Sequence, residues 1–337
     1  MATITGLGSY LPARKLTNGD LEAMVDTSDE WIVERTGIHE RRLAAPEQAT
    51  SDLAVEAASL ALADAGVTAG DLDLIIVATA TPDHLFPSTA CLVQKALGAR
   101  QIPAMDVSAA CTGFIYALAV AEGAIAAGRA ETVLVVGAET LSRITDYQDR
   151  KTCVLFGDGA GAVVVRRASS PDHGILSVFL GADGAGADIL KLPAGGSRLP
   201  ASTGTVSERL HFIHMDGQEV FKFAVGAMIR SVRESLKSAG LTPSGIDLLV
   251  PHQANARIVD AAVRLLRLPG GKVFHTIEDY GNMSSASVPV SLDAARRQGR
   301  LVRGAVTVMV AFGAGMTYGG AVVRWDAPRQ RQGDQEI

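Results

Sequence analysis

The sequence predicts an α/β protein built from two similar halves, for three reasons. Apolar runs of strand length alternate with longer alanine-rich patterns, as in DLIIVATA (73–80), the helix-like stretch 88–97 and ETVLVVGAE (131–139). This alternation favours a parallel-rich, layered fold whose strands are buried on both faces. A weak internal repeat aligns AGVTAGDLDLIIVAT (65–79) with AGLTPSGIDLLVPHQ (239–253). The length of 337 residues also exceeds the size that a single core usually reaches.

A second pair of similar stretches extends the repeat. FGDGAGAVVVR (156–166) aligns with FGAGMTYGGAVVRW (312–325), but at a smaller spacing than the first pair, so the two copies are expected to carry insertions of unequal length. Between the copies, residues 181–210 are rich in Gly, Ala, Pro and Ser. This segment is either a surface connection or a mobile flap over a site, and its composition suits both.

The composition excludes several classes of function. A net charge of -5 with 20% charged residues lacks the Lys and Arg excess that phosphate binding needs, so no nucleic-acid partner is expected. The N-terminus lacks a signal-peptide pattern, and no apolar run reaches the ~18 residues that span a bilayer. These features predict a soluble, cytoplasmic protein without a membrane partner. The glycine-rich motifs precede strands rather than open helices, which argues against a nicotinamide cofactor.

The cysteines and histidines predict neither a disulfide nor a metal site. The three cysteines, at 91, 111 and 153, are too few and too far apart for a disulfide framework and fit a reducing compartment. His211 and His214 lie in a strand-like stretch, where we expect their side chains to project to opposite faces rather than to share a metal ion.

Cys111 lies in DVSAACTGF (106–114), between a predicted short strand and an apolar helix that ends at Gly128. A thiol at such a turn faces free backbone N–H groups and the positive end of the helix dipole, and we expect both to lower its pKa. A free cysteine is, however, more often an inert core residue, which is how we interpret Cys91 and Cys153. Position alone leaves both interpretations of Cys111 open.

Two residues of the second copy suit a nucleophilic cysteine, which needs partners for proton transfer and for the charge that develops on a carbonyl oxygen. His252 ends the buried strand in LLVPHQAN, where the carboxyl end of a strand opens into a crevice. Asn282 follows a glycine in YGNMSSASVP, a pattern typical of a tight turn. Each residue alone is more often structural, but together they favour Cys111 as a nucleophile.

Seven motifs in order give the chain a family resemblance from about residue 3 to about residue 325. It resembles a β-ketoacyl-[acyl carrier protein] synthase III, an enzyme of the thiolase-like fold. The matching stretches are TSDEWIVERTGI (27–38), DVSAACTGF (106–114), DRKTCVLFGDGAGA (149–162), GQEVFKFAV (217–225), VPHQAN (250–255), GNMSSASVP (281–289) and AFGAGMTYG (311–319).

The resemblance implies a duplicated α/β fold in which helices and mixed five-stranded sheets form α-β-α-β-α layers. It implies an N-terminal half, residues 1–171, that carries the nucleophilic cysteine. The C-terminal half, residues 172–330, would carry His252 and Asn282, and residues 331–337 would form a polar tail.

The reaction that the resemblance implies is a decarboxylative Claisen condensation with a triad of Cys111, His252 and Asn282. Cys111 would take an acyl group from acetyl-CoA or another short-chain acyl-CoA. Malonyl-acyl carrier protein would then lose carbon dioxide and attack the thioester, giving 3-ketoacyl-acyl carrier protein and initiating fatty acid synthesis. His252 and Asn282 would donate hydrogen bonds to the malonyl thioester oxygen, and the backbone N–H groups of Cys111 and Ala314 to the acyl oxygen. No tightly bound cofactor is implied.

The resemblance further implies a homodimer with sites for both substrates. The residues that it assigns to coenzyme A are Trp31, Arg35, Thr36, Arg150, Gly217 and Asn255. The acyl pocket would consist of Leu141, Phe156, Ile213 and Met316, with Phe86 reaching across from the other subunit. Arg257, Arg264 and Arg267 fall within ~80° of one another on a predicted helix, which suggests a docking face for the acidic carrier protein.

Three residues depart from the family pattern and leave the identity of the acyl donor open. Thr112 and Ser285 each stand where Ala is usual, and Met283 stands where Thr is usual. Two other functions compete with the synthase. The chain could be a priming ketosynthase or acyltransferase of a polyketide or specialised-metabolite pathway, or a non-catalytic subunit that shapes a partner's product. The last is disfavoured, because such a subunit is expected to lose its cysteine.

Overall fold

The computed structural model describes residues 1–170 and 172–326 of the chain. Its first sheet has five strands in the order β1-β7-β6-β4-β5. β4 pairs in parallel with β5 and β6, whereas β7 runs antiparallel to β6 and β1. The elements of this half are β1 (Ala2–Tyr10), α3 (Thr50–Ala65), β4 (Leu74–Ala78), α4 (Thr89–Leu97), β5 (Ala104–Val107), α5 (Gly113–Ala126), β6 (Thr132–Thr140) and β7 (Asp158–Arg167).

The second sheet has four strands among the described residues, in the order β11-β12-β13-β8. The prediction of a second five-stranded sheet is therefore wrong, because the fifth strand is reduced to one parallel bridge between Leu249 and Val273. The elements of this half are β8 (Gly174–Ala182), α8 (Gly217–Ser238), β11 (Leu248–Pro251), α9 (Ala256–Leu266), α10 (Ile277–Tyr280), α11 (Ser287–Arg297), β12 (Val306–Gly313) and β13 (Thr317–Arg324).

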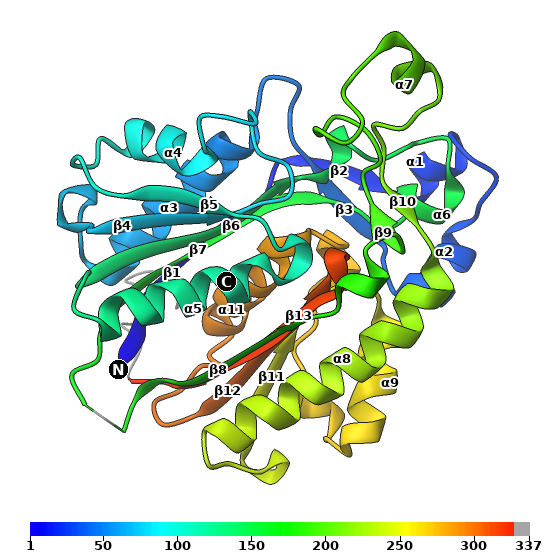
Figure 1. Cartoon of the computed structure of the whole chain (residues 1–337). Coiled ribbons are helices and arrows are strands. Elements are labelled where there is room, and N and C mark those ends of the chain that lie inside the picture. The colour runs from blue at the N-terminus through cyan, green and yellow to red at the C-terminus, as the bar shows by residue number, and fades with distance from the viewer. Residues whose placement is uncertain (171, 327–337) are drawn as a thin grey trace.

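The two sheets and their helices form five layers, as predicted (Figure 1). α5 and α11 lie between the sheets and contact both of them. α3 packs on the outer face of the first sheet and α8 on the outer face of the second. α5 is apolar almost all round because a helix in the central layer is covered on every side.

The internal repeat is confirmed around the strands β4 and β11. Gly66 and Gly240 end the preceding helices α3 and α8 with left-handed φ angles of 66° and 67°. Asp73 and Asp247 then precede the two strands, and each carboxylate accepts a hydrogen bond from the first backbone N–H of the neighbouring strand, at 3.1 Å from β6 and 2.8 Å from β12. Equivalent residues therefore perform equivalent structural tasks in the two copies.

The second pair of repeats does contain the equivalent strands β7 and β13, but the alignment of their residues is shifted. Glu139 of β6 lies opposite Gly159 of β7, and Gly313 of β12 lies opposite Thr317 of β13. Gly159 therefore corresponds to Thr317, whereas the sequence alignment pairs it with Gly315. The shift arises because residues 141–157 connect β6 to β7, while only Ala314–Met316 connect β12 to β13.

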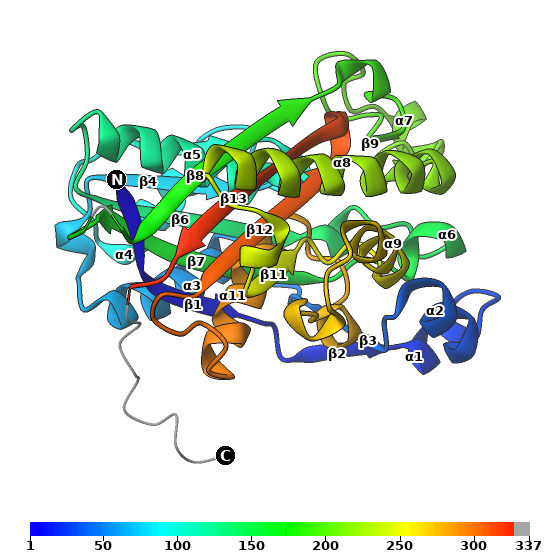
Figure 2. The same cartoon turned by 90° about the horizontal axis from the view of Figure 1, so that it is seen from below.

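Three insertions extend from the layered core at one end of the molecule, where Figure 2 shows them beyond the sheets. Most of the segment 181–210 belongs to the third insertion and holds short elements of its own, so it is more ordered than its composition indicates. The inserted elements are β2 (Arg14–Thr17), α1 (Asn18–Glu22), α2 (Asp29–Thr36), β3 (Glu40–Leu43), α6 (Arg150–Cys153), β9 (Leu190–Lys191), α7 (Thr203–Ser207) and β10 (His214–Met215). The predicted polar tail, residues 331–337, lies outside the described residues.

Candidate active site

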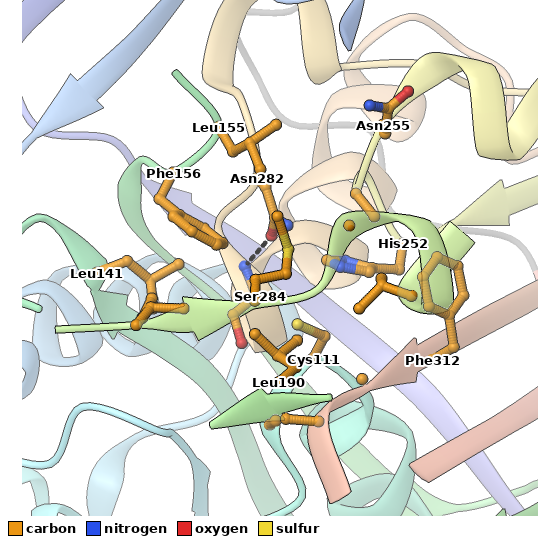
Figure 3. A pocket seen from close by; sticks show the side chains of 18 of the residues that line it. Cys111, Leu141, Leu155, Phe156, Leu190, His252, Asn255, Asn282, Ser284 and Phe312 are labelled. Atoms are coloured by element: carbon orange, nitrogen blue, oxygen red, sulfur yellow. Dashed lines mark hydrogen bonds between the residues drawn. The ribbon is translucent and has the colours of Figure 1, made fainter. Parts of the chain in front are cut away.

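Cys111 lies at the turn between β5 and α5, as the sequence predicts. A short 3-10 helix, Ala110–Thr112, links the two elements, and its first residue has a positive φ of 44°. The half-buried Cys111 lines a cavity of about 410 Å³. His252 and Asn282 line the same cavity, although both belong to the other half of the chain (Figure 3).

The prediction of a lowered thiol pKa is wrong. Burial raises the pKa of Cys111 to about 12, and the negative charge of Glu139 adds to the increase. A hydrogen bond from the Ser284 hydroxyl and the Cys111 backbone N–H act in the opposite direction, but they do not outweigh burial. The resting nucleophile is therefore a thiol, and its proton must move when the sulfur attacks a substrate.

His252 follows β11 and is buried beside the cavity. Burial lowers its pKa to about 3, so the imidazole is neutral at physiological pH. Neither ring nitrogen has a hydrogen-bond partner among the described residues. The ring meets Phe312 edge to face, with 5.6 Å between the ring centroids, which fixes its plane. A neutral imidazole whose polar atoms lack partners suits a donor to a ligand oxygen.

Asn282 is held by its backbone and by its own carboxamide oxygen. The Asn282 N–H donates to the Leu155 carbonyl at 2.9 Å, and its side-chain oxygen accepts from the Ser284 N–H at 2.9 Å. The amide nitrogen Nδ2 makes no hydrogen bond within the described part of the chain. Because the oxygen is already bound, the N–H groups of this side chain remain for a ligand.

The turn at Gly313 and Ala314 packs directly against the cysteine turn. A Cβ atom at Gly313 would lie 2.8 Å from the Cys111 backbone nitrogen, so only glycine permits this approach. Ala314 follows and lines the cavity. The Thr112 hydroxyl is fully buried and accepts from the Thr317 hydroxyl at 3.0 Å. Thr112 therefore links the two turns from below, and it does not line the cavity.

Strained backbone is concentrated around this cavity. Ala110, Ser284 and Met316 have φ angles of 44°, 45° and 47°, and all three line it. Positive φ is unfavourable for residues with a side chain and persists where the surrounding structure imposes it, most often at functional sites. Met283, by contrast, packs in a small core cluster and does not line the cavity.

The residues predicted to bind coenzyme A lie on or beside the wall of the cavity. Five of them line it: Trp31, Arg35, Thr36, Gly217 and Asn255. Arg150 does not, but its guanidinium carbon lies 4.9 Å from the centroid of the Trp31 ring, and that of Arg35 lies 5.8 Å away. Trp31 and Arg150 are thus in direct contact, and an aromatic base between them would have to separate the two side chains.

The predicted acyl-pocket residues lie close to Cys111, with one exception. Leu141, Phe156, Ile213 and Met316 line the cavity. Phe86 does not: it is 85% exposed on the loop between β4 and α4. Sequence reasoning missed other apolar lining residues, among them Ile144, Leu155, Leu190 and Phe312. Leu155 and Phe312 lie inside matched motifs, and Ile144 and Leu190 lie in inserted segments, but in neither place does their spacing indicate a pocket.

The three predicted docking arginines are exposed, but they do not share one helix face. Arg257 and Arg264 lie on α9, which Asn255 caps by accepting from the Arg257 N–H at 2.9 Å. Arg267 adopts a left-handed φ of 56° and ends the helix. The predicted arc therefore holds for Arg257 and Arg264 and is wrong for Arg267.

Two charged or polar neighbours of the nucleophile were not predicted. Glu139 is fully buried at the end of β6, and Ser284 lines the cavity beside Cys111. A charged residue at the end of the apolar run 131–139 was the available signal for the first. Ser284 lies in a matched motif, but only the fold places it against the thiol.

No group of three or more His, Cys, Asp or Glu side chains within the described ranges could hold a metal ion. His211 contacts the Thr205 hydroxyl instead, at 2.9 Å. None of the helices described is both long enough and apolar enough to cross a membrane.

Comparison with known proteins identifies the family to which these residues belong. The family model for 3-oxoacyl-[acyl-carrier-protein (ACP)] synthase III matches residues 105–184, and the model for its C-terminal part matches residues 236–325. The β-ketoacyl-[acyl-carrier-protein] synthase III of Caldanaerobacter subterraneus subsp. tengcongensis is 57% identical over 324 residues, covering 96% of this chain and 98% of that protein. The chain belongs to the β-ketoacyl-[acyl-carrier-protein] synthase III family.

Solved structures agree with this assignment. The 3-oxoacyl-[acyl-carrier-protein] synthase III of Aquifex aeolicus has a TM-score of 0.89 and 47% identity, covering 96% of this chain and all of that one. A priming β-ketosynthase from a polyketide biosynthetic pathway has a TM-score of 0.90 but only 37% identity, covering 98% of this chain and 97% of its own. The fold alone does not separate the two functions, whereas sequence identity favours the synthase III.

Proposed function

We propose that Cys111, His252 and Asn282 carry out the condensation of the synthase III family in this enzyme. An acyl-CoA and malonyl-acyl carrier protein give 3-ketoacyl-acyl carrier protein, the step that initiates fatty acid synthesis. The supporting observation is the convergence of a thiol, a neutral imidazole and an oriented carboxamide on one cavity. We assign the nucleophile to an N-terminal half, residues 1–171, and the two donors to a C-terminal half, residues 172–330.

In the first half-reaction the Cys111 sulfur attacks the acyl-CoA carbonyl. The backbone N–H groups of Cys111 and Ala314 hold the developing oxyanion, because the close approach at Gly313 brings the two turns together. Coenzyme A leaves as a thiolate that takes a proton from water, and the acyl group remains on Cys111. Leu141, Phe156, Ile213 and Met316 surround that acyl group with apolar side chains.

In the second half-reaction the malonyl thioester of the carrier protein occupies the same cavity. Its carbonyl oxygen accepts hydrogen bonds from His252 and from Asn282 Nδ2. Decarboxylation places negative charge on this oxygen as an enolate, and two preorganised donors stabilise that charge. The enolate carbon attacks the Cys111 thioester and releases the thiolate. This chemistry needs no tightly bound cofactor, because the thioester carbonyl of the substrate itself takes up the electron pair that carbon dioxide leaves behind.

Coenzyme A reaches the thiol through the end of the cavity lined by Trp31, Arg35, Thr36, Gly217 and Asn255, with Arg150 stacked on Trp31. The same mouth receives the phosphopantetheine arm of the carrier protein. Arg257 and Arg264 follow Asn255 on α9, beside this mouth, and Arg267 ends that helix. Their positive charge would attract an acidic carrier protein to an enzyme whose own net charge is -5.

A homodimer is the proposed assembly, and the cytoplasm the proposed location. β5 is an edge strand of the first sheet, and an unpaired edge is a site for strand addition. Leu85 and Phe86, 84% and 85% exposed, project from the preceding loop. Exposed apolar groups of this size indicate a protein contact, so Phe86 would complete the acyl pocket of the other subunit. Sedimentation of a monomer at micromolar concentration would refute the dimer.

Intact mass spectrometry tests the function. The enzyme is incubated with a panel of acyl-CoAs, and we expect one acyl group per chain, located on Cys111 by peptide mapping. Addition of malonyl-acyl carrier protein should remove it and yield 3-ketoacyl-acyl carrier protein and carbon dioxide. Acylation without carbon dioxide release would favour an acyltransferase, and absence of acylation with every donor would refute the proposal.

Charge reversal tests the docking face. Arg257→Glu should raise the KM for malonyl-acyl carrier protein about tenfold while acylation by acyl-CoA stays unchanged. Arg233→Glu is the matched control, because Arg233 is an exposed residue of α8 and the substitution makes the same charge change without touching the lining of the cavity. Equal effects of the two substitutions would contradict the assignment.

A further inference from the structure

Glu139 is a buried carboxyl that the condensation described above does not use. It lies at the end of β6 and is fully inaccessible to solvent. No Lys, Arg or His of the described residues forms an ion pair with it, and burial raises its pKa. Its nearest hydrogen-bond donors are hydroxyl and backbone N–H groups: Thr79 Oγ1 at 3.3 Å, Ala80 N at 3.0 Å, Thr81 Oγ1 at 2.8 Å, Ser285 Oγ at 2.8 Å and Ser285 N at 3.4 Å.

Burial of a carboxyl without a cation is costly, so its position next to the active site requires an explanation. Ser284 lies near both groups: its 3-10 helix, Ser284–Ala286, contacts the Cys111 turn and β6, and its hydroxyl lowers the pKa of both the Cys111 thiol and the Glu139 carboxyl. Figure 3 shows Ser284 immediately beside Cys111. A strained φ of 45° places the Ser284 side chain there. The Ser284 hydroxyl is thus the group that lies between the thiol and the carboxyl.

The imidazole at the cavity is a poor proton acceptor. Burial lowers the pKa of His252 to about 3, so its imidazole is a weak base. The thiol, whose pKa is about 12, needs a base when it attacks. A carboxyl with a raised pKa is better matched to this task, and hydroxyl neighbours such as Thr81 and Ser285 can reverse their hydrogen bonds once it carries a proton.

We propose that Glu139 receives the Cys111 proton through the Ser284 hydroxyl during acylation. The proposal deepens the function above and depends on Cys111 being the acylated nucleophile. As the sulfur–carbon bond forms, the thiol proton passes to Ser284 Oγ, and the Ser284 proton passes to the Glu139 carboxylate. Coenzyme A leaves as a thiolate and takes a proton from water.

The proton returns in the second half-reaction. When the enolate carbon attacks the acyl-enzyme, the bond from carbonyl carbon to sulfur breaks and the Cys111 thiolate is released. Glu139 then reprotonates this thiolate through Ser284, and the carboxylate is restored. The net reaction consumes one proton from solvent, matching the release of coenzyme A as a thiol and of carbon dioxide.

Glu139→Gln tests the proposal, because it keeps the shape of the side chain and removes the base. We measure the pH dependence of two rates: acylation by acetyl-CoA and alkylation of Cys111 by iodoacetamide, both followed by mass spectrometry. Both rates should fall about 100-fold near pH 7 and recover as the pH rises. Ser284→Ala should have the same effect.

If Glu139 acted only through its charge, Glu139→Gln would change the reactivity of Cys111 in the opposite direction. Its negative charge raises the thiol pKa, so removing the charge would make Cys111 more reactive in Glu139→Gln. Faster alkylation, or an unchanged pH profile, would overturn the relay. Ser285→Ala sharpens the test: it removes one donor to the carboxylate and should shift the inflection of the acylation profile to higher pH.

Asp158→Asn is the matched control for loss of a buried carboxyl. Asp158 is fully buried and accepts from Ser142 and Ala44, and no contact links it to Cys111. If Asp158→Asn slows alkylation of Cys111 as much as Glu139→Gln does, general destabilisation explains both and the relay is refuted. Failure of the wild-type enzyme to acylate Cys111 would instead refute the proposed function, so the two failures are distinguishable.

Discussion

The strand-to-helix turns of the two halves have the same backbone but face different surroundings. Ala110 and Ser284 have φ angles of 44° and 45°, and each begins a three-residue 3-10 helix that leads into a central helix, α5 or α11. Cys111 and Ser285 are thus equivalent positions. Each turn packs against the end of the central strand of the opposite half: Cys111 against Gly313 of β12, and Ser285 against Glu139 of β6.

The difference between the two turns explains why only one of them forms an active site. At the first turn, glycine leaves space in front of the Cys111 N–H, and this space opens into the cavity. At the second turn, the Glu139 carboxylate occupies the equivalent space and accepts from the Ser285 N–H at 3.4 Å. An internal carboxylate therefore lies where the proposed mechanism places a substrate oxyanion in the first copy. In that mechanism the two copies have equivalent anion sites, and Glu139 fills the second of them.

Removing the nucleophile should have the largest effect, because the first turn then loses its reactive group. Cys111→Ala is expected to lower condensation by about 10⁴-fold or more, because no covalent intermediate forms. Placing a cysteine at the equivalent position, in Cys111→Ala with Ser285→Cys, should not restore acylation, since that side chain is buried away from the cavity. Acylation of the new cysteine in a mass spectrum would contradict the asymmetry. Cys153→Ala, a buried cysteine elsewhere, is the control.

Loss of the donors should affect one half-reaction only. His252→Ala is expected to lower decarboxylation of malonyl-acyl carrier protein by about 10²–10³-fold, because one of two enolate donors is removed. Acylation of Cys111 by acyl-CoA should persist, since its oxyanion is held by backbone N–H groups. Release of carbon dioxide and acyl-enzyme formation are measured separately. Parallel loss of both would show that His252 acts in the first step as well.

Closing the open space at the first turn should make it resemble the second. Gly313→Ala adds a Cβ 2.8 Å from the Cys111 nitrogen, although the φ of -167° itself suits any residue. The turns must move apart, and we expect kcat for acylation to fall about 10-fold to 100-fold with a smaller change in KM. Gly315→Ala is less informative, because its φ of 78° adds strain of another kind. Full activity of Gly313→Ala would remove the oxyanion space from the explanation.

Acid should destabilise the fold through His252. The folded pKa of about 3 lies below the ordinary value of 6.5, so below pH 6.5 the unfolded chain binds a proton that the folded chain does not. The free energy of unfolding should therefore fall by about 1.4 kcal/mol per pH unit from this group as the pH drops from 6.5 towards 3. Urea unfolding across this range measures the slope. The slope should be shallower in His252→Asn, and an identical slope would contradict the assigned burial effect.

The smallest expected effect concerns Thr112, beside the nucleophile. Its hydroxyl joins Thr317 at 3.0 Å below the cavity, so Thr112→Val should cost about 1 kcal/mol of stability. The preference among acyl-CoAs should not change, because Thr112 does not line the cavity. Thermal unfolding and competition between acetyl-CoA and a longer acyl-CoA provide the two measurements. A changed acyl preference would show that Thr112 acts on the pocket.

Sequence patterns predicted the elements that carry the site more reliably than its electrostatics. The turn at Cys111, the strand end at His252 and the tight turn at Asn282 follow from local periodicity and glycine placement. The pKa of Cys111 was predicted in the wrong direction, because the helix dipole is a local feature whereas burial comes from the whole fold. The placement of Arg267 on the helix face was wrong for a local reason instead: this residue adopts a left-handed conformation that ends the helix.

The amino-acid sequence by itself determined that this chain has two α/β copies, a cysteine at a strand-to-helix turn and the motifs of its family, because these depend on short-range patterns. Only the tertiary structure decided what faces each turn. Glu139 and Ser285 are 146 residues apart, and Cys111 and Gly313 lie in different halves. When the two halves pack together, the end of β12 meets the turn at Cys111 and the end of β6 meets the turn at Ser285. One turn thereby becomes an open site, and the other holds a buried carboxylate beneath it.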